Sequence, residues 1–201
     1  MQRTKSLLHK ISTVISTILL TPPLACTFLA AQGKNMGNSL IAPEMFEMCK
    51  EFTDHAEKNN INLHLPIDFL IEENGALKYT KTDIIPENAK IISIGKRTQE
   101  LYCKIIASMD AGVFNGPSGF IERTETIQET MNLLKAVEQL PELQIIAGGD
   151  SVLFAQQLLS TNNKTYLSTG GGATLYYIGN NTLPGLQPFN KADKNLTCSN
   201  H

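Results

Sequence analysis

The sequence predicts an α/β domain with a mostly parallel sheet. Two observations predict this class. Short apolar, β-branched segments alternate along the chain with segments whose apolar residues recur at helical spacing. Three glycine-rich loops, at 115–119, 147–151 and 168–173, each follow directly after one of the apolar segments. Loops at the carboxyl ends of parallel strands have this arrangement, and helices would then cover both faces of the sheet.

Length and composition narrow the classes of protein. The 201 residues allow one good-sized domain or two small ones, and a 42% hydrophobic, 18% charged composition indicates a folded chain. A net charge of −2 gives no electrostatic reason to expect nucleic acid or an anionic membrane as partner. No internal linker is visible, so we expect one domain over 1–186 and a polar tail over 187–201.

The basic, apolar N-terminus has two interpretations. Arg3, Lys5 and Lys10 precede Ile11–Leu20, and small residues follow near Ala30 and Ala31, which resembles a secretory signal peptide. The same apolar run is rich in β-prone residues and equally fits a buried strand. It is too short and polar for a membrane span. These residues alone do not decide between the signal and the strand.

Each element has its own local signal. Pro43 suits a first helical position, Asn74-Gly75 is a hairpin signal, and glycine or paired asparagines end several segments. The predicted helices are 24–32, 42–58, 97–109, 125–139, 152–160 and 173–178. The predicted strands are 62–65, 90–94, 111–114, 143–147 and 166–168, with a hairpin or loop over 72–83.

The three glycine loops are the candidate site. Because the carboxyl ends of parallel strands share one edge, the loops should meet around one crevice. Two of them lead straight into helices, whose N-terminal amides suit a phosphate. Tight turns would explain single glycines, but three in a row at 170–172 favour a close approach to a ligand.

Several polar residues near these loops have two possible roles. Asp150 could hold Mg²⁺ beside a phosphate, or cap the helix that follows. Ser151 could donate to a phosphate oxygen or simply sit in the first helical turn. Glu122 could accept from ribose hydroxyls or be an ordinary first-turn glutamate. Lys96 and Arg97 could add charge near the crevice, although solvated residues at a helix start are more usual.

Three ordered blocks resemble the carboxyl-terminal, nucleotide-binding domain of phosphoglycerate kinase. They are GVFNGPSGFIE at 112–122, AGGDS at 147–151 and LSTGGGATLYYIGNNTLPGL at 167–186. Further matches are ACTFLAAQGKNMGNSL at 25–40, LHLPIDF at 63–69 and IISIGKRT at 91–98. The resemblance implies a Rossmann-like three-layer sandwich with about six strands that binds Mg²⁺ with ATP or ADP. It also makes Ile11–Leu20 an internal strand.

The resemblance implies a role for each matching position. Beside the ribose and adenosine phosphates lie Asn115, Pro117, Phe120 and Glu122. The adenine cleft is lined by Leu65 and the backbone around Ile92. Asp150 is the metal-nucleotide residue, and Ser151 is a phosphate-binding position. The catalytic backbone donors that face the transferring phosphoryl group are Gly149, Gly171 and Gly172.

Departures from the family pattern are equally informative. The sequence contains no counterpart of the family's amino-terminal domain, which binds phosphoglycerate. It also contains no counterpart of the family's GGAK…DK segment with its lysines. Thr21-Pro22-Pro23 stands where the family has glycines beside the adenine, and proline removes an amide donor. Ser93 and Glu129 replace the family's Asp and Gly, which indicates relaxed constraint.

Two functional hypotheses follow from the resemblance. In the first, the chain is the nucleotide half of a phosphoglycerate kinase, and turnover needs a separate amino-terminal domain as partner. In the second, it is a catalytically inactive nucleotide-binding remnant or scaffold protein. Either is expected to be cytoplasmic, with export the alternative if residues 1–31 act as a signal peptide.

Overall fold

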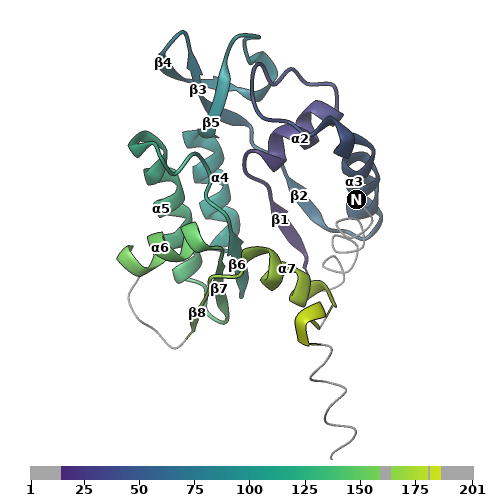
Figure 1. Ribbon diagram of the computed structural model, residues 1–201, viewed down its shortest axis with the longest axis vertical. Coiled ribbons are helices and arrows are strands. Elements are labelled where there is room, and N and C mark those ends of the chain that lie inside the picture. Colours follow the sequence, from purple (N-terminus) through teal and green to yellow (C-terminus); the bar gives the residue numbers. More distant parts are fainter. Residues whose placement is uncertain (1–14, 159–163, 181, 187–201) are drawn as a thin grey trace, which may run out of the picture.

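The computed structural model describes residues 15–158, 164–180 and 182–186. In this part of the chain, strands and helices are interspersed, and the colours of Figure 1 show their order along the chain from purple to yellow. The tail expected over 187–201 and the start of the expected strand Ile11–Leu20 lie outside the described residues. The division into a domain and a tail therefore stays a prediction.

The first unit is a parallel strand pair with two helices packed on it. Its elements are β1 (Thr17–Leu19), α2 (Leu24–Ala31), η1 (Pro43–Met45), α3 (Phe46–Lys58) and β2 (Asn62–His64). β1 and β2 pair in parallel with Ile18 opposite Leu63. Gly33 ends α2 with a φ of +85°, a left-handed conformation that glycine adopts without a Cβ clash. The apolar run near the N-terminus therefore does contain a strand.

The second unit is an antiparallel sheet. Its elements are β3 (Asp68–Glu73), β4 (Ala76–Lys81), η2 (Thr82–Ile84) and β5 (Lys90–Ile94), with the strand order β4-β3-β5. Asn74 and Gly75 join β3 to β4 with φ values of 51° and 79°. A two-residue hairpin turn of type I′ requires positive φ at both positions, so the hairpin predicted here is confirmed.

The third unit is a parallel sheet with its connecting helices. Its elements are α4 (Lys96–Ile106), β6 (Gly112–Asn115), α5 (Thr124–Glu138), β7 (Gln144–Ala147), α6 (Gly149–Leu158), β8 (Thr165–Ser168), α7 (Gly171–Asn180) and η3 (Pro184–Leu186). The strand order is β6-β7-β8. The last residues of the three strands, Asn115, Ala147 and Ser168, lie side by side in the register. All three strands therefore end at one edge.

Helices cover the strands on both faces. Ile18 of β1 packs with α2 and α3, whereas its neighbour Leu19 packs on the opposite face against Tyr102 of α4 and Leu133 of α5. Phe114 of β6 contacts that same α4–α5 cluster. Successive side chains of a strand point to opposite faces, so one strand can serve two layers. The predicted α/β class with three layers is confirmed.

Hydrogen bonding divides the strands of the described part of the chain into three groups. Three of the five pairings are parallel, and β5 pairs antiparallel with β3. The resemblance implies one sheet of about six strands, but among the described residues the strands form separate ladders, and no ladder joins β1 to β6. Of the helices within 15–158, 164–180 and 182–186, none has the length and apolar character needed to cross a membrane.

Candidate functional site

The three glycine loops contact one another at the carboxyl edge of β6, β7 and β8. The Gly116 amide donates to Ser151 Oγ at 3.1 Å, which links the loop after β6 to the start of α6. The Gly148 amide donates to the Ser168 carbonyl at 2.9 Å, which links the loop after β7 to the end of β8. The sequence prediction that these loops meet at one place is confirmed.

Two of the loops contain a glycine with left-handed backbone dihedral angles. Gly116 and Gly148 have φ values of +94° and +97° and come directly after β6 and β7. A side chain at either position would be strained, because L-residues rarely adopt this conformation. Each glycine turns the chain sharply at the end of its strand. The loops can therefore stay close to the sheet edge.

Gly171 is needed for packing, whereas Gly149 and Gly172 border open space. A Cβ on Gly171 would lie 2.7 Å from Asn115 Oδ1 and 3.1 Å from Gly148 Cα. A Cβ on Gly149 or Gly172 would meet no atom within 4 Å. The loop after β8 thus packs against its neighbours through Gly171. Gly149, at the start of α6, and Gly172, in α7, leave their backbone accessible at the surface.

The N-termini of α6 and α7 lie at this edge. The Val152 amide already bonds the Gly148 carbonyl at 2.9 Å, and the Thr174 amide bonds the Gly170 carbonyl at 2.7 Å. The amides of the first three residues of each helix precede these bonds and have no intrahelical acceptor. Two sets of amide donors, with the positive ends of two helix dipoles, are therefore directed to one edge.

Asp150 lies inside α6, not before it. The interpretation of Asp150 as the N-cap of a helix that starts at residue 151 is wrong, because α6 begins at Gly149. Gly148, in the left-handed conformation, lets the helix start two residues earlier. Asp150 is exposed in the first helical turn, where a carboxylate is favoured by the helix dipole.

Ser151 follows Asp150 in α6 and is fully buried. Its Oγ accepts the Gly116 amide and so holds two loops together. The hydroxyl points into the protein in this structure, and its expected contact with a phosphate stays a prediction.

The N-terminus of α4 differs because the protein's own carboxylate fills it. Asp68, from β3, accepts the Thr98 amide at 2.8 Å through Oδ1 and the Arg97 amide at 3.2 Å through Oδ2. Asp68 is buried. Its role was missed in the sequence because the partners are about thirty positions apart and no spacing rule connects them. The Arg97 and Thr98 amides of α4 are therefore already occupied, whereas the first amides of α6 and α7 are directed to the candidate site.

The segment after Gly116 runs along β5. The Phe120 amide donates to the Ile92 carbonyl at 3.0 Å, and the Ile94 amide donates to the Ser118 carbonyl at 3.2 Å. The ring of Phe120 lies under Lys90, whose Nζ is 4.7 Å from the ring centroid. These contacts join Ile92 and Phe120 to the glycine loops. Pro117 in this segment is half-buried.

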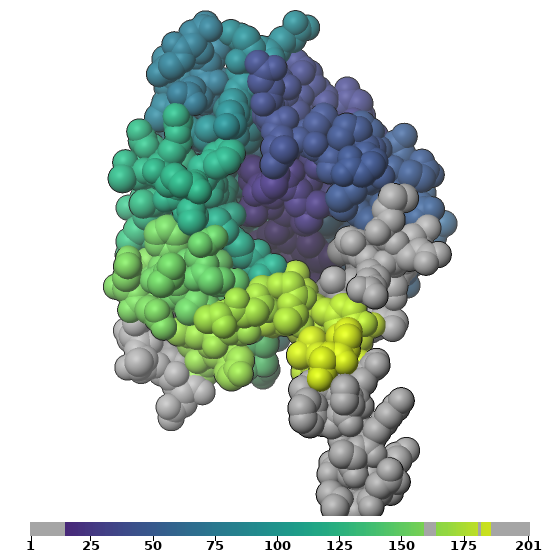
Figure 2. Space-filling model, in the orientation of Figure 1, coloured from purple at the N-terminus to yellow at the C-terminus, as the bar shows by residue number. Residues whose placement is uncertain are grey.

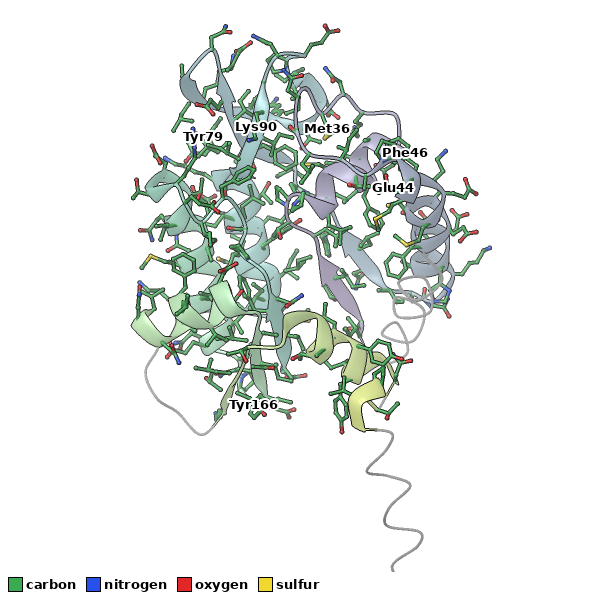
Figure 3. The ribbon with its side chains drawn as sticks, viewed as in Figure 1. Met36, Glu44, Phe46, Tyr79, Lys90 and Tyr166 are labelled. Atoms are coloured by element: carbon green, nitrogen blue, oxygen red, sulfur yellow. The ribbon has the colours of Figure 1, made fainter. Side chains whose placement is uncertain are left out.

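Other predicted site residues lie apart from these contacts. Leu65 is half-buried and packs against the core clusters around α2. Glu122 is exposed after the Phe120 segment. Lys96 stacks on Tyr79 of the hairpin sheet, with Nζ 5.0 Å from the ring centroid. Tyr79 and Lys90 both lie in the upper part of Figure 3, on the hairpin sheet. The expectation that Lys96 adds charge to the crevice is therefore replaced by a surface cation–π contact.

The surface is hollowed between the first and third units. Figure 2 shows a recess whose floor is the purple segment of β1 and the start of α2. Teal and green atoms border it on one side and yellow-green atoms border it below. Thr21-Pro22-Pro23 follows β1, and Pro23 precedes the first residue of α2 without any side-chain cap. The prolines leave fewer amide donors at this point than glycines would.

The cysteines in the described residues are not suited to nucleophilic chemistry. Burial raises the pKa of Cys26 to about 12 and that of Cys49 to about 11. A thiol attacks as its thiolate, so both remain protonated and unreactive near neutral pH. Across the described ranges, no three His, Cys, Asp or Glu side chains gather closely enough to hold a metal ion.

The fold and the site together define a class of protein. It is an α/β domain that gathers glycine-rich loops and open helix N-termini at the carboxyl edge of a parallel sheet.

Comparison with known proteins identifies the family. The profile of the family described as phosphoglycerate kinase matches residues 2–181, so the chain belongs to the phosphoglycerate kinase family. The phosphoglycerate kinase of Clostridium botulinum strain 657 is 33% identical over 180 residues, which is 88% of this chain and 45% of the relative. That of Roseiflexus castenholzii is 31% identical over 182 residues, 89% of this chain and 46% of the relative.

The chain also resembles solved structures of phosphoglycerate kinases. Phosphoglycerate kinase from Coxiella burnetii superposes with a TM-score of 0.82 at 28% identity, over 94% of this chain and 49% of that one. The enzyme from Pyrococcus horikoshii shares the fold, with a TM-score of 0.77 at 23% identity over 96% of this chain. The chain thus spans about half the length of the relatives that it matches.

Proposed function

We propose that this chain provides the Mg-nucleotide half of a phosphoglycerate kinase, which transfers a phosphoryl group between 1,3-bisphosphoglycerate and ADP. The observation that carries the proposal is the meeting of two open helix N-termini, at Gly149 and Gly171, at one sheet edge. Amides at a helix N-terminus are well suited to bind phosphate oxygens. Phosphoryl transfer depends mainly on positioning and on stabilising charge, which backbone donors provide.

The site also fits a magnesium ion that arrives with the nucleotide. Mg²⁺ takes oxygen ligands and commonly binds through one or two carboxylates, substrate phosphates and water. Asp150 presents an exposed carboxylate next to the α6 amides, and Gly149 beside it leaves open space. An ion held there would supply positive charge that offsets the negative charge of the phosphates. Asp150 would hold the ion, and the amides of α6 and α7 would orient the phosphates.

Binding of MgADP tests this proposal. Isothermal titration measures the dissociation constant of MgADP. Asp150→Asn should raise this constant about tenfold, a loss of about 1.4 kcal/mol of binding free energy. The same variant should affect metal-free ADP little, because the carboxylate acts through Mg²⁺. Asp54→Ala, an exposed carboxylate on α3, is the matched control and should change neither affinity.

Two outcomes would contradict the nucleotide proposal. One is the absence of heat and of a thermal shift at millimolar MgADP, since any ligand of the native state must raise stability. The other is an equal loss of ADP and MgADP affinity in Asp150→Asn, which would assign Asp150 to helix stability.

A second candidate function is a nucleotide-binding protein without turnover. Pro22 and Pro23 favour it, because they remove amide donors at the carboxyl end of β1, where the family has glycines. In this version the chain keeps the phosphate-binding edge and serves as a scaffold. Both candidates predict MgADP binding, and they differ in phosphoryl transfer.

A further inference from the structure

A buried hydroxyl joins the carboxyl ends of β1 and β2. Tyr102 of α4 is fully buried, and its hydroxyl lies 2.8 Å from the Leu20 carbonyl oxygen and 3.0 Å from the His64 carbonyl oxygen. His64 is the last residue of β2, and Leu20 directly follows β1. One side chain of a covering helix therefore contacts both strands at the point where they end.

The ladder between the two strands explains why Leu20 needs a donor. The Asn62 amide donates to the Ser16 carbonyl at 2.9 Å, and the parallel register repeats this bond at every second residue of β2. The third bond of the series would run from the amide of residue 66 to the Leu20 carbonyl. Residue 66 is Pro66, which has no amide hydrogen. The ladder therefore stops one bond short, at the Leu20 carbonyl.

Tyr102 supplies the missing donor. A tyrosine hydroxyl has one proton, and the His64 carbonyl already accepts the Leu20 amide at 3.0 Å. The shorter contact of the hydroxyl is the one with the Leu20 carbonyl, which has no ladder donor. Burial raises the pKa of Tyr102 above its ordinary value, so the hydroxyl keeps its proton near neutral pH. Tyr102 thus occupies the role that an amide at residue 66 would have in a continuous ladder.

Two chain segments leave the sheet at this hydrogen bond. After Leu20 the chain leads through two prolines into α2, and the Ala25 amide returns to the Thr21 carbonyl at 3.0 Å. After His64 comes Leu65, which packs against the same core cluster that contains Leu20. Because the hydroxyl holds the carbonyls at both strand ends, it determines where these two segments begin.

The segment after β1 lies in the recess that borders the candidate site. The end of β1 and the start of α2 form the floor of this recess, and α7 borders it below (Figures 1 and 2). The N-terminus of α7 at Gly171 is one of the two phosphate-binding ends proposed above. A nucleotide held there by its phosphates would extend its base into the recess. Binding sites of this kind are concave and largely apolar, and Leu65 offers an apolar side chain next to the floor.

We propose that Tyr102 is a positioning residue for the nucleotide, whose hydroxyl fixes residues 21–23 and Leu65 and thereby increases affinity for the base but not for the phosphates. This inference rests on the proposed function, because it requires a nucleotide whose phosphates bind at α6 and α7. Tyr102 is too deeply buried to touch a ligand. It acts only through the carbonyls of Leu20 and His64.

Two ligands that differ by the nucleoside test the inference. Tyr102→Phe removes the hydroxyl and keeps the ring. It should raise the dissociation constant of MgADP about fivefold, the effect of one hydrogen bond. The constant of Mg-pyrophosphate, which has no base, should stay unchanged. Tyr166→Phe, at an exposed tyrosine, is the matched control and should change neither constant. A purely structural role of Tyr102 would not separate the two ligands.

A second substitution can return the donor from the opposite side. Pro66→Ala gives residue 66 an amide hydrogen at the position where the ladder requires one. In the double variant Tyr102→Phe/Pro66→Ala, the dissociation constant of MgADP should equal that of Pro66→Ala alone. In NMR spectra without ligand, Tyr102→Phe should shift the Leu20 carbonyl and the Leu65 amide. The same substitution should shift them less in the Pro66→Ala background, because the new amide already bonds the Leu20 carbonyl.

The possible failures are distinguishable. Wild-type binding of MgADP with an unchanged constant in Tyr102→Phe would overturn this inference and leave the proposed function intact. An equal loss of affinity for MgADP and Mg-pyrophosphate would also overturn it, since the effect would then not concern the base. So would a Leu20 carbonyl resonance that does not move in Tyr102→Phe. Failure of the wild-type chain to bind MgADP would overturn the proposed function, and this inference with it.

Discussion

Gly171 and Gly172 are adjacent, yet they should respond in opposite ways to one added methyl group. Gly171→Ala places a Cβ 2.7 Å from Asn115 Oδ1 and 3.1 Å from Gly148 Cα, and should cost about 1–3 kcal/mol of stability through overpacking. Gly172→Ala meets no neighbour. It should leave stability unchanged or raise it by up to about 1 kcal/mol, since alanine favours a helix. Urea unfolding measures both values.

The same pair separates packing from ligand binding. If the Gly172 backbone faces a phosphate, Gly172→Ala should weaken MgADP binding while the protein stays as stable as the wild type. Equal stability of the two variants would contradict the packing that the structure shows around Gly171.

Two substitutions relative to the family are integrated into the protein. Ser93 is buried, and its hydroxyl donates to the Ser118 carbonyl at 3.2 Å. Glu129 is buried and accepts the Tyr79 hydroxyl at 3.3 Å through Oε1, while Oε2 has no hydrogen-bond partner. The sequence indicated relaxed constraint at both positions. The structure instead gives each side chain a hydrogen bond with a neighbouring element.

At the scale of elements, the start of α4 depends on a carboxylate from another element. Asp68→Ala removes the acceptor of the Arg97 and Thr98 amides, and should cost about 1–3 kcal/mol because buried amides lose their partner. Asp68→Asn keeps one oxygen acceptor and should cost less. Urea unfolding of both variants beside Asp54→Ala gives the comparison. A change below about 0.5 kcal/mol in Asp68→Ala, typical of a surface substitution, would contradict the capping role.

Elements with a local cause were predictable from the sequence. The hairpin at Asn74-Gly75 and the bounds of β5 follow from turn chemistry and β-branched residues close in the chain. The antiparallel pairing of β5 with β3 was not predicted, because the hydrogen-bond partners of a strand are set by distant segments. The start of α6 at Gly149 was missed for a similar reason. Glycines are poor helix formers, and the left-handed Gly148 became visible only in the structure.

At the scale of the whole molecule, the candidate site is better defined than the sheet that carries it. The glycine blocks predicted the edge where α6 and α7 begin, since three loops after three strands must share it. The sequence did not predict that, among the described residues, no ladder would join β1 to β6. Each strand has a sound local pattern, and pairing across a sheet is a property of the assembled fold.

Phosphoryl transfer by the 201-residue polypeptide is the measurement that separates the two candidate functions. Transfer requires donor and acceptor to be held in line, an arrangement that contributes much of the rate. The open amides of α6 and α7 lie at one edge of the sheet, and the chain spans 45% of the length of a relative such as the Clostridium botulinum enzyme. We therefore expect no ATP formation from 1,3-bisphosphoglycerate and MgADP by this polypeptide alone.

Addition of a separate phosphoglycerate-binding half should restore turnover if the chain is half of an enzyme, and should have no effect if it is a scaffold. Asp150→Ala is the control: its weaker MgADP binding should shift the restored turnover to about tenfold higher MgADP, whereas a contaminating kinase would keep the wild-type dependence on MgADP. Turnover by the purified polypeptide alone that shows this shift in Asp150→Ala would mean that these 201 residues hold both reactants, and both candidate functions would then be wrong as stated.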